Sequence, residues 1–147
     1  MAQPERGSEN RTESWIERLK RPQRMEHIEP VAARFIFSLR LIAVHHRAKR
    51  DPTSELTARL GNIAIAVKAF QLSETLCQTW PEPICLRPFC CQALSHDETT
   101  IAAMLEAAWS GQRDLFVDQL NGLVRRDRIE WLWRDCSELV ASELAHI

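Results

Sequence analysis

The sequence predicts an all-α fold: a single-domain helical bundle of five to seven helices around one central buried helix. Residues 31–48 are apolar on nearly every side when placed on a helix, which is typical of a buried helix. Apolar residues recur at helical spacing along most of the remaining chain. The chain has only 4 Gly and no Tyr, whereas hairpin-rich β folds use glycines in turns and aromatic residues in strands.

The length of 147 residues predicts one domain, which can bury about 70% of its unfolded surface without a disulfide, a metal ion or another cofactor. We expect no targeting segment, because the start of the chain is polar. We expect no membrane span, because Arg34 and Arg40 interrupt the most apolar stretch. Five cysteines at irregular spacing then indicate reduced thiols and a cytoplasmic location.

The first predicted elements are a tail and a short arm. Residues 1–11 are polar, so we expect a disordered tail before a helical domain over residues 12–147. Thr12 can cap a short helix that Pro22 ends. This arm either folds back on the core or docks on a second subunit. Its apolar side chains are Trp15, Ile16 and Leu19.

The central helix comes next, and Pro30 suits its first turn because the missing N–H costs nothing there. The apolar side chains divide into two groups: Val31, Phe35, Leu39 and Ile42 on one side, and Phe37, Leu41 and Val44 on another. Two narrow polar strips remain, one with Arg34, Ser38 and His45 and the other with Arg40 and Arg47. This pattern predicts a helix that its neighbours cover almost completely.

A long helix is predicted from Ser54 to Thr79, with Gly61 as a kink or a point of close approach. The prolines after Trp80 end it. Two apolar stripes are expected to be buried. The first consists of Leu56, Leu60, Ile63, Val67 and Phe70, and the second of Ile65, Leu72 and Leu76.

The last third of the chain predicts four shorter elements. Pro88 opens a short helix through Leu94. Ser95 and Glu98 resemble a capping box for the following helix, although Asp97 is an equally good cap. That helix ends at Gly111 and forms an antiparallel hairpin with one that starts near Arg113 and carries Phe116, Leu120 and Leu123. Asp127 caps the final helix, whose buried stripe is Ile129, Leu132, Trp133, Cys136, Leu139 and Val140.

Charge is distributed unevenly. Residues 15–50 hold nine Lys or Arg against three Glu, and residues 51–147 hold eight basic against fourteen acidic residues. Either the two parts attract each other within one fold, or the basic part binds nucleic acid or an acidic partner. The candidate phosphate contacts are Arg18, Lys20, Arg21, Arg24, Arg47, Lys49 and Arg50.

Catalytic and metal-binding motifs are weak in this sequence. Cys90 and Cys91 follow Pro88 in a predicted first helical turn, where a thiolate is stabilised, so they are candidate reactive thiols. Adjacent cysteines diverge on a helix, and no Cys-x-x-Cys motif occurs, so we expect no metal site. We therefore predict that the protein is not an enzyme.

One tryptophan indicates an interaction surface. Trp131 lies opposite the apolar stripe of the last helix, and an exposed tryptophan is costly unless something covers it. Either the N-terminal arm covers it with Trp15 or Met25, or it belongs to an interface to which Trp109 could contribute.

These patterns predict a small, non-catalytic, cytoplasmic, bacterial interaction or regulatory protein that binds a protein partner or itself, for example as a homodimer. The alternative is a nucleic-acid-associated transcriptional regulator that uses the basic 18–50 segment. A third hypothesis is a thiol-dependent enzyme at Cys90 or Cys91.

Overall fold

The computed structural model describes residues 23–147, and within them six α-helices follow one short 3-10 turn. The turn η1 spans Met25–His27, and the helices are α2 (Pro30–Arg47), α3 (Thr53–Leu60), α4 (Ile63–Thr79), α5 (His96–Trp109), α6 (Arg113–Leu120) and α7 (Arg126–Ala145). The predicted all-α fold is confirmed. The predicted tail and arm at residues 1–22 lie outside the described residues.

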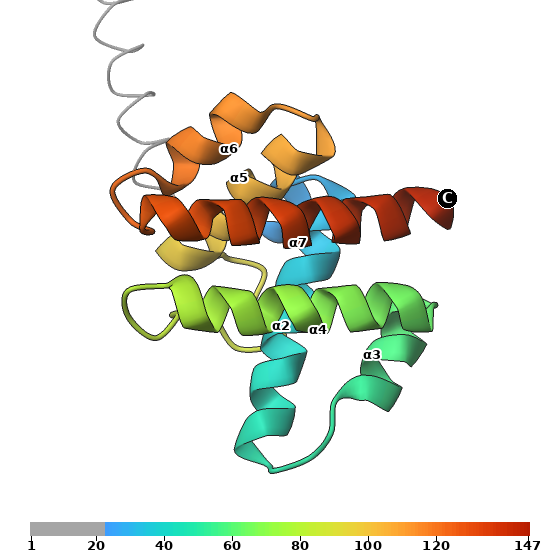
Figure 1. Cartoon of the computed structure of the whole chain (residues 1–147). Helices are drawn as coiled ribbons and strands as arrows, with labels where there is room; N and C mark the ends of the chain where they lie inside the picture. Colours follow the sequence, from blue (N-terminus) through green and yellow to red (C-terminus); the bar gives the residue numbers. More distant parts are fainter. Residues whose placement is uncertain (1–22) are drawn as a thin grey trace, which may run out of the picture.

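The helices are arranged around a crossing. Helices α4 and α7 run antiparallel side by side, and α2 crosses them at a steep angle (Figure 1). Helices α5 and α6 form the predicted hairpin and pack against α2 and α7, while α3 packs beside α4 and α2. One main hydrophobic core joins side chains from α2, α4, α5, α6 and α7.

Helix α2 is the central helix that the sequence predicts, with bounds close to the expected 31–48. Phe35 is 2% exposed and Leu41 is also buried, while Phe37 is partly buried. Burial declines toward the C-terminal end, where Val44 and His46 are exposed. Burial of α2 is therefore greatest between Val31 and Leu41 and lower after Leu41.

The predicted long helix from 54 to 79 is wrong, because the chain forms two helices there. Gly61 has a φ of +82°, a left-handed conformation that ends α3. The side chain of Asn62 accepts hydrogen bonds from the N–H groups of Ala64 (2.7 Å) and Ile65 (3.3 Å), which starts α4. A C-cap followed at once by an N-cap breaks the helix rather than bending it.

This break also changes which face of the second half is buried. Ile63 is 62% exposed and Val67 is also exposed, although both were expected in a buried stripe. Ile65, Leu72 and Leu76, the second predicted stripe, are buried in α4 as expected. The first predicted stripe is wrong because α4 has a new axis after Gly61. Helical spacing counted from α3 across Gly61 therefore does not identify the buried face of α4.

The predicted short helix from Pro88 to Leu94 is absent. The N–H of Cys91 donates to the carbonyl of Pro88 in a turn (2.9 Å). The N–H of Leu94 donates to the carbonyl of Gln23 (2.6 Å), and the N–H of Met25 donates to the carbonyl of Gln92 (2.8 Å). These long-range bonds use backbone groups that a helix would need, so the segment forms a turn followed by an extended stretch.

The later helix ends agree only partly with prediction. Ser95 and Glu98 form the predicted capping box of α5, and Gly111 follows its end with a φ of +68°. Helix α6 ends at Leu120, so Leu123 lies beyond it. Asp127 is not the cap of α7: the N-cap position is Arg125, and Asp127 lies inside the first turn, where a negative charge still suits the helix dipole.

Candidate functional site

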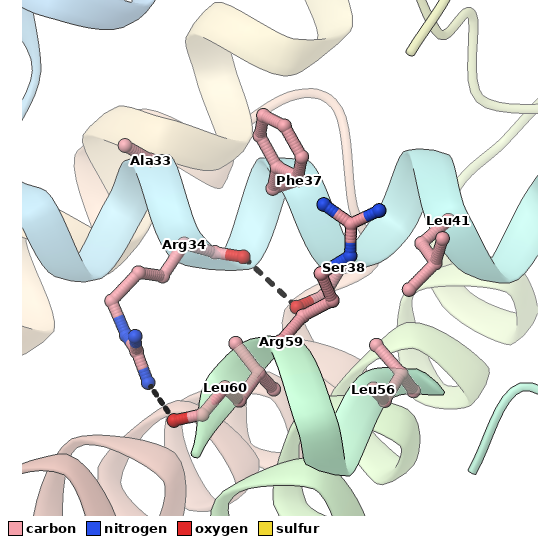
Figure 2. Close-up of a pocket in the computed structure, with 8 residues that line it drawn as sticks. All are labelled: Ala33, Arg34, Phe37, Ser38, Leu41, Leu56, Arg59 and Leu60. Atoms are coloured by element: carbon pink, nitrogen blue, oxygen red, sulfur yellow. Dashed lines mark hydrogen bonds between the residues drawn. The ribbon is translucent and has the colours of Figure 1, made fainter. Parts of the chain in front are cut away.

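The first candidate site is an apolar groove between α2 and α3, with a cavity volume of about 320 Å³. Figure 2 shows its two walls, one from each helix. We call it the α2–α3 groove. Its lining residues are Ala33, Arg34, Phe37, Ser38 and Leu41 from α2 and Leu56, Arg59 and Leu60 from α3.

Most polar groups in the α2–α3 groove are already bonded within the chain. The Arg34 guanidinium donates to the carbonyl of Leu60 (2.8 Å) and pairs with Glu143 (3.0 Å). The Ser38 hydroxyl donates to the carbonyl of Arg34 (2.9 Å). The dashed lines in Figure 2 mark the bonds to the Leu60 and Arg34 carbonyls. The groove therefore offers a new ligand mainly apolar surface.

Arg59 is the charged group at the edge of this groove. Its side chain is 54% exposed, and its nearest carboxylate contact is a long one to Glu55 (3.6 Å). Its guanidinium carbon lies 5.6 Å from the ring centroid of Phe89, and that ring packs edge-on against Phe37 (4.6 Å between centroids). Arg59 thus places a positive charge beside an aromatic wall.

His45 and Glu55 hold the turn between α2 and α3. His45 Nε2 lies 2.5 Å from Glu55 Oε2. This hydrogen bond lowers the pKa of the Glu55 carboxyl. His45 Nδ1 is buried and has no hydrogen-bond partner among the described residues. The contact ties the C-terminal end of α2 to the first turn of α3.

A second groove lies on the other side of α2, with a volume of about 860 Å³. We call it the α2–α4 groove. Residues two positions apart on a helix differ by about 200° in direction, so Leu39 in this groove and Leu41 in the first face opposite ways. The walls of the second groove come from α2, α4 and the extended segment 80–86.

A buried ion pair positions the loop before α5. Arg40 and Glu98 form a bidentate pair at 2.7 and 3.0 Å, and their side chains are 1% and 0% exposed. Arg40 also donates to the carbonyls of Cys91 (2.6 Å) and Ala93 (3.1 Å). The interpretation of Arg40 as part of a polar strip missed this pair. An arginine inside an apolar helix was the available signal, because a buried charge needs a partner.

The structure separates the predicted nucleic-acid contacts. Arg24 lies before the N-terminal end of α2, whereas Arg47, Lys49 and Arg50 are exposed at its C-terminal end. A helix of 18 residues is about 27 Å long. The described basic residues therefore do not form one continuous surface. Three predicted contacts, Arg18, Lys20 and Arg21, lie outside the part of the chain that the structure describes.

Of the three predicted interface tryptophans, one is clearly accessible. Trp131 is 43% exposed and lies over Arg128, whose guanidinium carbon is 5.7 Å from the ring centroid. Trp109 is partly buried against the main core, and Trp15 falls in the undescribed N-terminal stretch. Met25, which one interpretation placed over Trp131, packs within the main core.

The candidate thiols lie in the extended loop before α5. Cys90 is exposed and Cys91 is partly buried. Because the predicted helix after Pro88 is absent, no helix N-terminus is there to stabilise a thiolate. Burial raises the pKa of the Cys136 thiol well above its usual value. Within residues 23–147, no cluster of three or more His, Cys, Asp or Glu side chains is placed to hold a metal ion.

Comparisons with protein families, curated proteins and solved structures find no match for this chain. Between residues 23 and 147, no helix has both the length and the apolar character needed to cross a membrane.

Proposed function

We propose that this protein is a non-catalytic interaction module that binds a segment of a partner protein in the α2–α3 groove. The segment inserts one or two large apolar side chains between the helices and places a carboxylate near Arg59. The observation that supports this proposal is an open, largely apolar groove between α2 and α3, beside an exposed arginine. Interfaces commonly centre on an apolar anchor surrounded by polar contacts.

The sign of the charge favours an acidic partner segment. The groove is lined by two arginines and by no carboxylate. Arg47, Lys49 and Arg50 are exposed at the turn between α2 and α3, where these three basic residues outnumber Asp51 and Glu55. Such a region attracts an acidic segment before the apolar contacts form.

The other hypotheses remain proposals with less support. For nucleic acid, the turn at Arg47, Lys49 and Arg50 could contact phosphates, but the basic residues described are split between the two ends of α2. For thiol chemistry, Cys90 is accessible but has no helix N-terminus beside it. A cytoplasmic location, in which the accessible thiols stay reduced, is part of our main proposal.

A peptide selection tests the partner class. A library of random peptides is selected against the full-length protein and counter-selected against Ala33→Phe, which fills the α2–α3 groove. We expect the enriched peptides to combine large apolar residues with Asp or Glu. Arg59→Glu should weaken their binding about tenfold, since a carboxylate would then meet a like charge.

Arg126→Glu provides the matched control, because it makes the same charge change at an exposed position on α7. It should leave the affinity of the selected peptides unchanged, and circular dichroism should show equal helicity for all variants. Enrichment of basic peptides, or of peptides that bind Ala33→Phe as well as the wild type, would exclude the proposed site.

A further inference from the structure

The α2–α4 groove has the size and lining of a small-molecule site. Its volume of about 860 Å³ falls in the range of about 300–1,000 Å³ that is usual for ligand pockets. Three elements contribute apolar side chains to its walls. Leu39 and Ile42 come from α2, Phe70 from α4, and Trp80 and Ile84 from the segment 80–86.

The extended wall of this groove is held in place before any ligand arrives. Trp80 Nε1 donates to Asp97 Oδ1 (3.3 Å), and the N–H of Cys85 donates to Asp97 Oδ2 (2.8 Å). The Ser95 hydroxyl donates to the carbonyl of Cys85 (2.5 Å). These bonds tie the segment to the start of α5, and its prolines fix the backbone further. A preformed wall lowers the entropy cost of binding.

Two carboxylates, Glu74 and Glu82, line this groove together with His46 and Cys77. Glu74 and Glu82 are exposed along it, and neither forms an ion pair with a described residue. No Lys or Arg is among the lining residues. Burial and the neighbouring Glu74 raise the pKa of the Cys77 thiol, so Cys77 is neutral. The groove thus has the opposite charge from the α2–α3 groove on the other side of the helix.

We propose that the α2–α4 groove binds a small organic cation with an apolar body. The body lies against Leu39, Ile42 and Phe70, and the cationic group lies between Glu74 and Glu82. The aromatic walls add to the preference for a positive charge, since cations are attracted to the faces of aromatic rings. The argument for this site does not rest on the partner binding that we propose for the α2–α3 groove.

Three probes with one apolar body and different charges test the inference on the full-length protein. They are 4-phenylbutylamine, 4-phenylbutanol and 4-phenylbutyrate, and their binding is followed by calorimetry and by NMR shifts. The amine should bind at least about fivefold more tightly than the alcohol at low salt, because each nearby carboxylate contributes about that factor in water. The carboxylate probe should bind most weakly. The shifted amides should map to the groove walls at residues 39–46 and 70–86.

Substitutions at the two carboxylates test the source of the preference. The double variant Glu74→Gln/Glu82→Gln should bind the amine no better than the alcohol, while its affinity for the alcohol stays unchanged. Asp114→Asn/Asp118→Asn, with the same charge change at exposed positions on α6, should keep the preference. The inference is overturned by equal binding of amine and alcohol to the wild type, by a preference that survives in the double variant, or by no binding of any probe. None of these outcomes bears on the peptide selection.

Discussion

Arg40 is the residue on which the position of the loop before α5 depends. Its guanidinium bonds to Glu98 on α5 and to the carbonyls of Cys91 and Ala93. Glu98 also accepts from the N–H of Ser95 (2.9 Å), so the same carboxylate closes the capping box. The pair is buried, and each charge is tolerated only because its hydrogen bonds are satisfied.

Removing one member of this pair should be costly. We expect Arg40→Met to lower the free energy of unfolding by about 3–5 kcal/mol, because it leaves the Glu98 charge buried without its partner. The double variant Arg40→Met/Glu98→Gln should recover part of this loss, since no uncompensated charge remains. Urea denaturation measures both. If the losses of Arg40→Met and of Glu98→Gln added up to the loss of the double variant, the two residues would not be coupled. Arg126→Met on the surface serves as the control.

Glu55 should make stability depend on acid pH. Its hydrogen bond with His45 lowers the pKa of the carboxyl in the folded state. The resulting stabilisation is therefore fully present at pH values above the ordinary pKa of a glutamate, and it is lost as the pH falls through the lowered pKa of Glu55. We expect Glu55→Gln to lose less stability than the wild type between neutral and acid pH, as thermal unfolding can measure.

Glu106 provides a control, because the pKa of its carboxyl is shifted in the opposite direction from that of Glu55. Burial raises the pKa of its carboxyl, so its contribution to stability falls as pH rises from the ordinary range toward the raised value. Glu106→Gln should therefore gain stability relative to the wild type at neutral pH and not at acid pH.

For Glu55, parallel pH profiles of the wild type and Glu55→Gln would show that the contact between Glu55 and His45 is not formed in solution.

At the scale of elements, Gly61 and Asn62 decide that two helices form where one was predicted. Gly61 adopts a left-handed conformation, and a Cβ built on it would meet nothing within 4 Å. Gly61→Ala should therefore cost about 1–2 kcal/mol through backbone strain alone. Gly61→Asn should cost less, because asparagine tolerates this conformation. Equal losses in urea denaturation would contradict this explanation.

The elements that sequence reasoning predicted well are those with local signals. The apolar circumference of α2 and the capping box of Ser95 are visible in the sequence, and both are present. The loop at 88–94 was misassigned because its backbone pairs with Gln23 and Met25, far away in the chain. Neither groove could be predicted, because their shapes depend on the angles at which α3 and α4 cross α2.

At the scale of the whole molecule, part of the charge asymmetry is satisfied internally. Arg34 pairs with Glu143, and Arg40 pairs with Glu98, so the basic first part of the described chain contacts the acidic remainder. Arg47, Lys49 and Arg50 remain exposed. Attraction between the two parts is therefore present at Arg34 and Arg40, whereas steering of a partner by Arg47, Lys49 and Arg50 stays a proposal.

Self-association through Trp131 is a prediction at the same scale. Trp131 is 43% exposed on α7, and tryptophan is favoured at the centres of interfaces. Trp131→Ala should shift the protein toward the monomer in sedimentation velocity without changing its helicity. An unchanged distribution would exclude this surface, and Leu115→Ala, at another exposed apolar side chain, is the control.

The central claim is that α2 is the buried core of the bundle between Val31 and Leu41 and also contributes a wall to each of the two grooves. Amide hydrogen exchange along α2 in the full-length protein tests this most directly. We expect the amides of residues 35–41 to exchange only through global unfolding, and those of residues 44–47 to exchange through faster local opening. Exchange of residues 35–41 as fast as that of the short helix α3 would contradict the account.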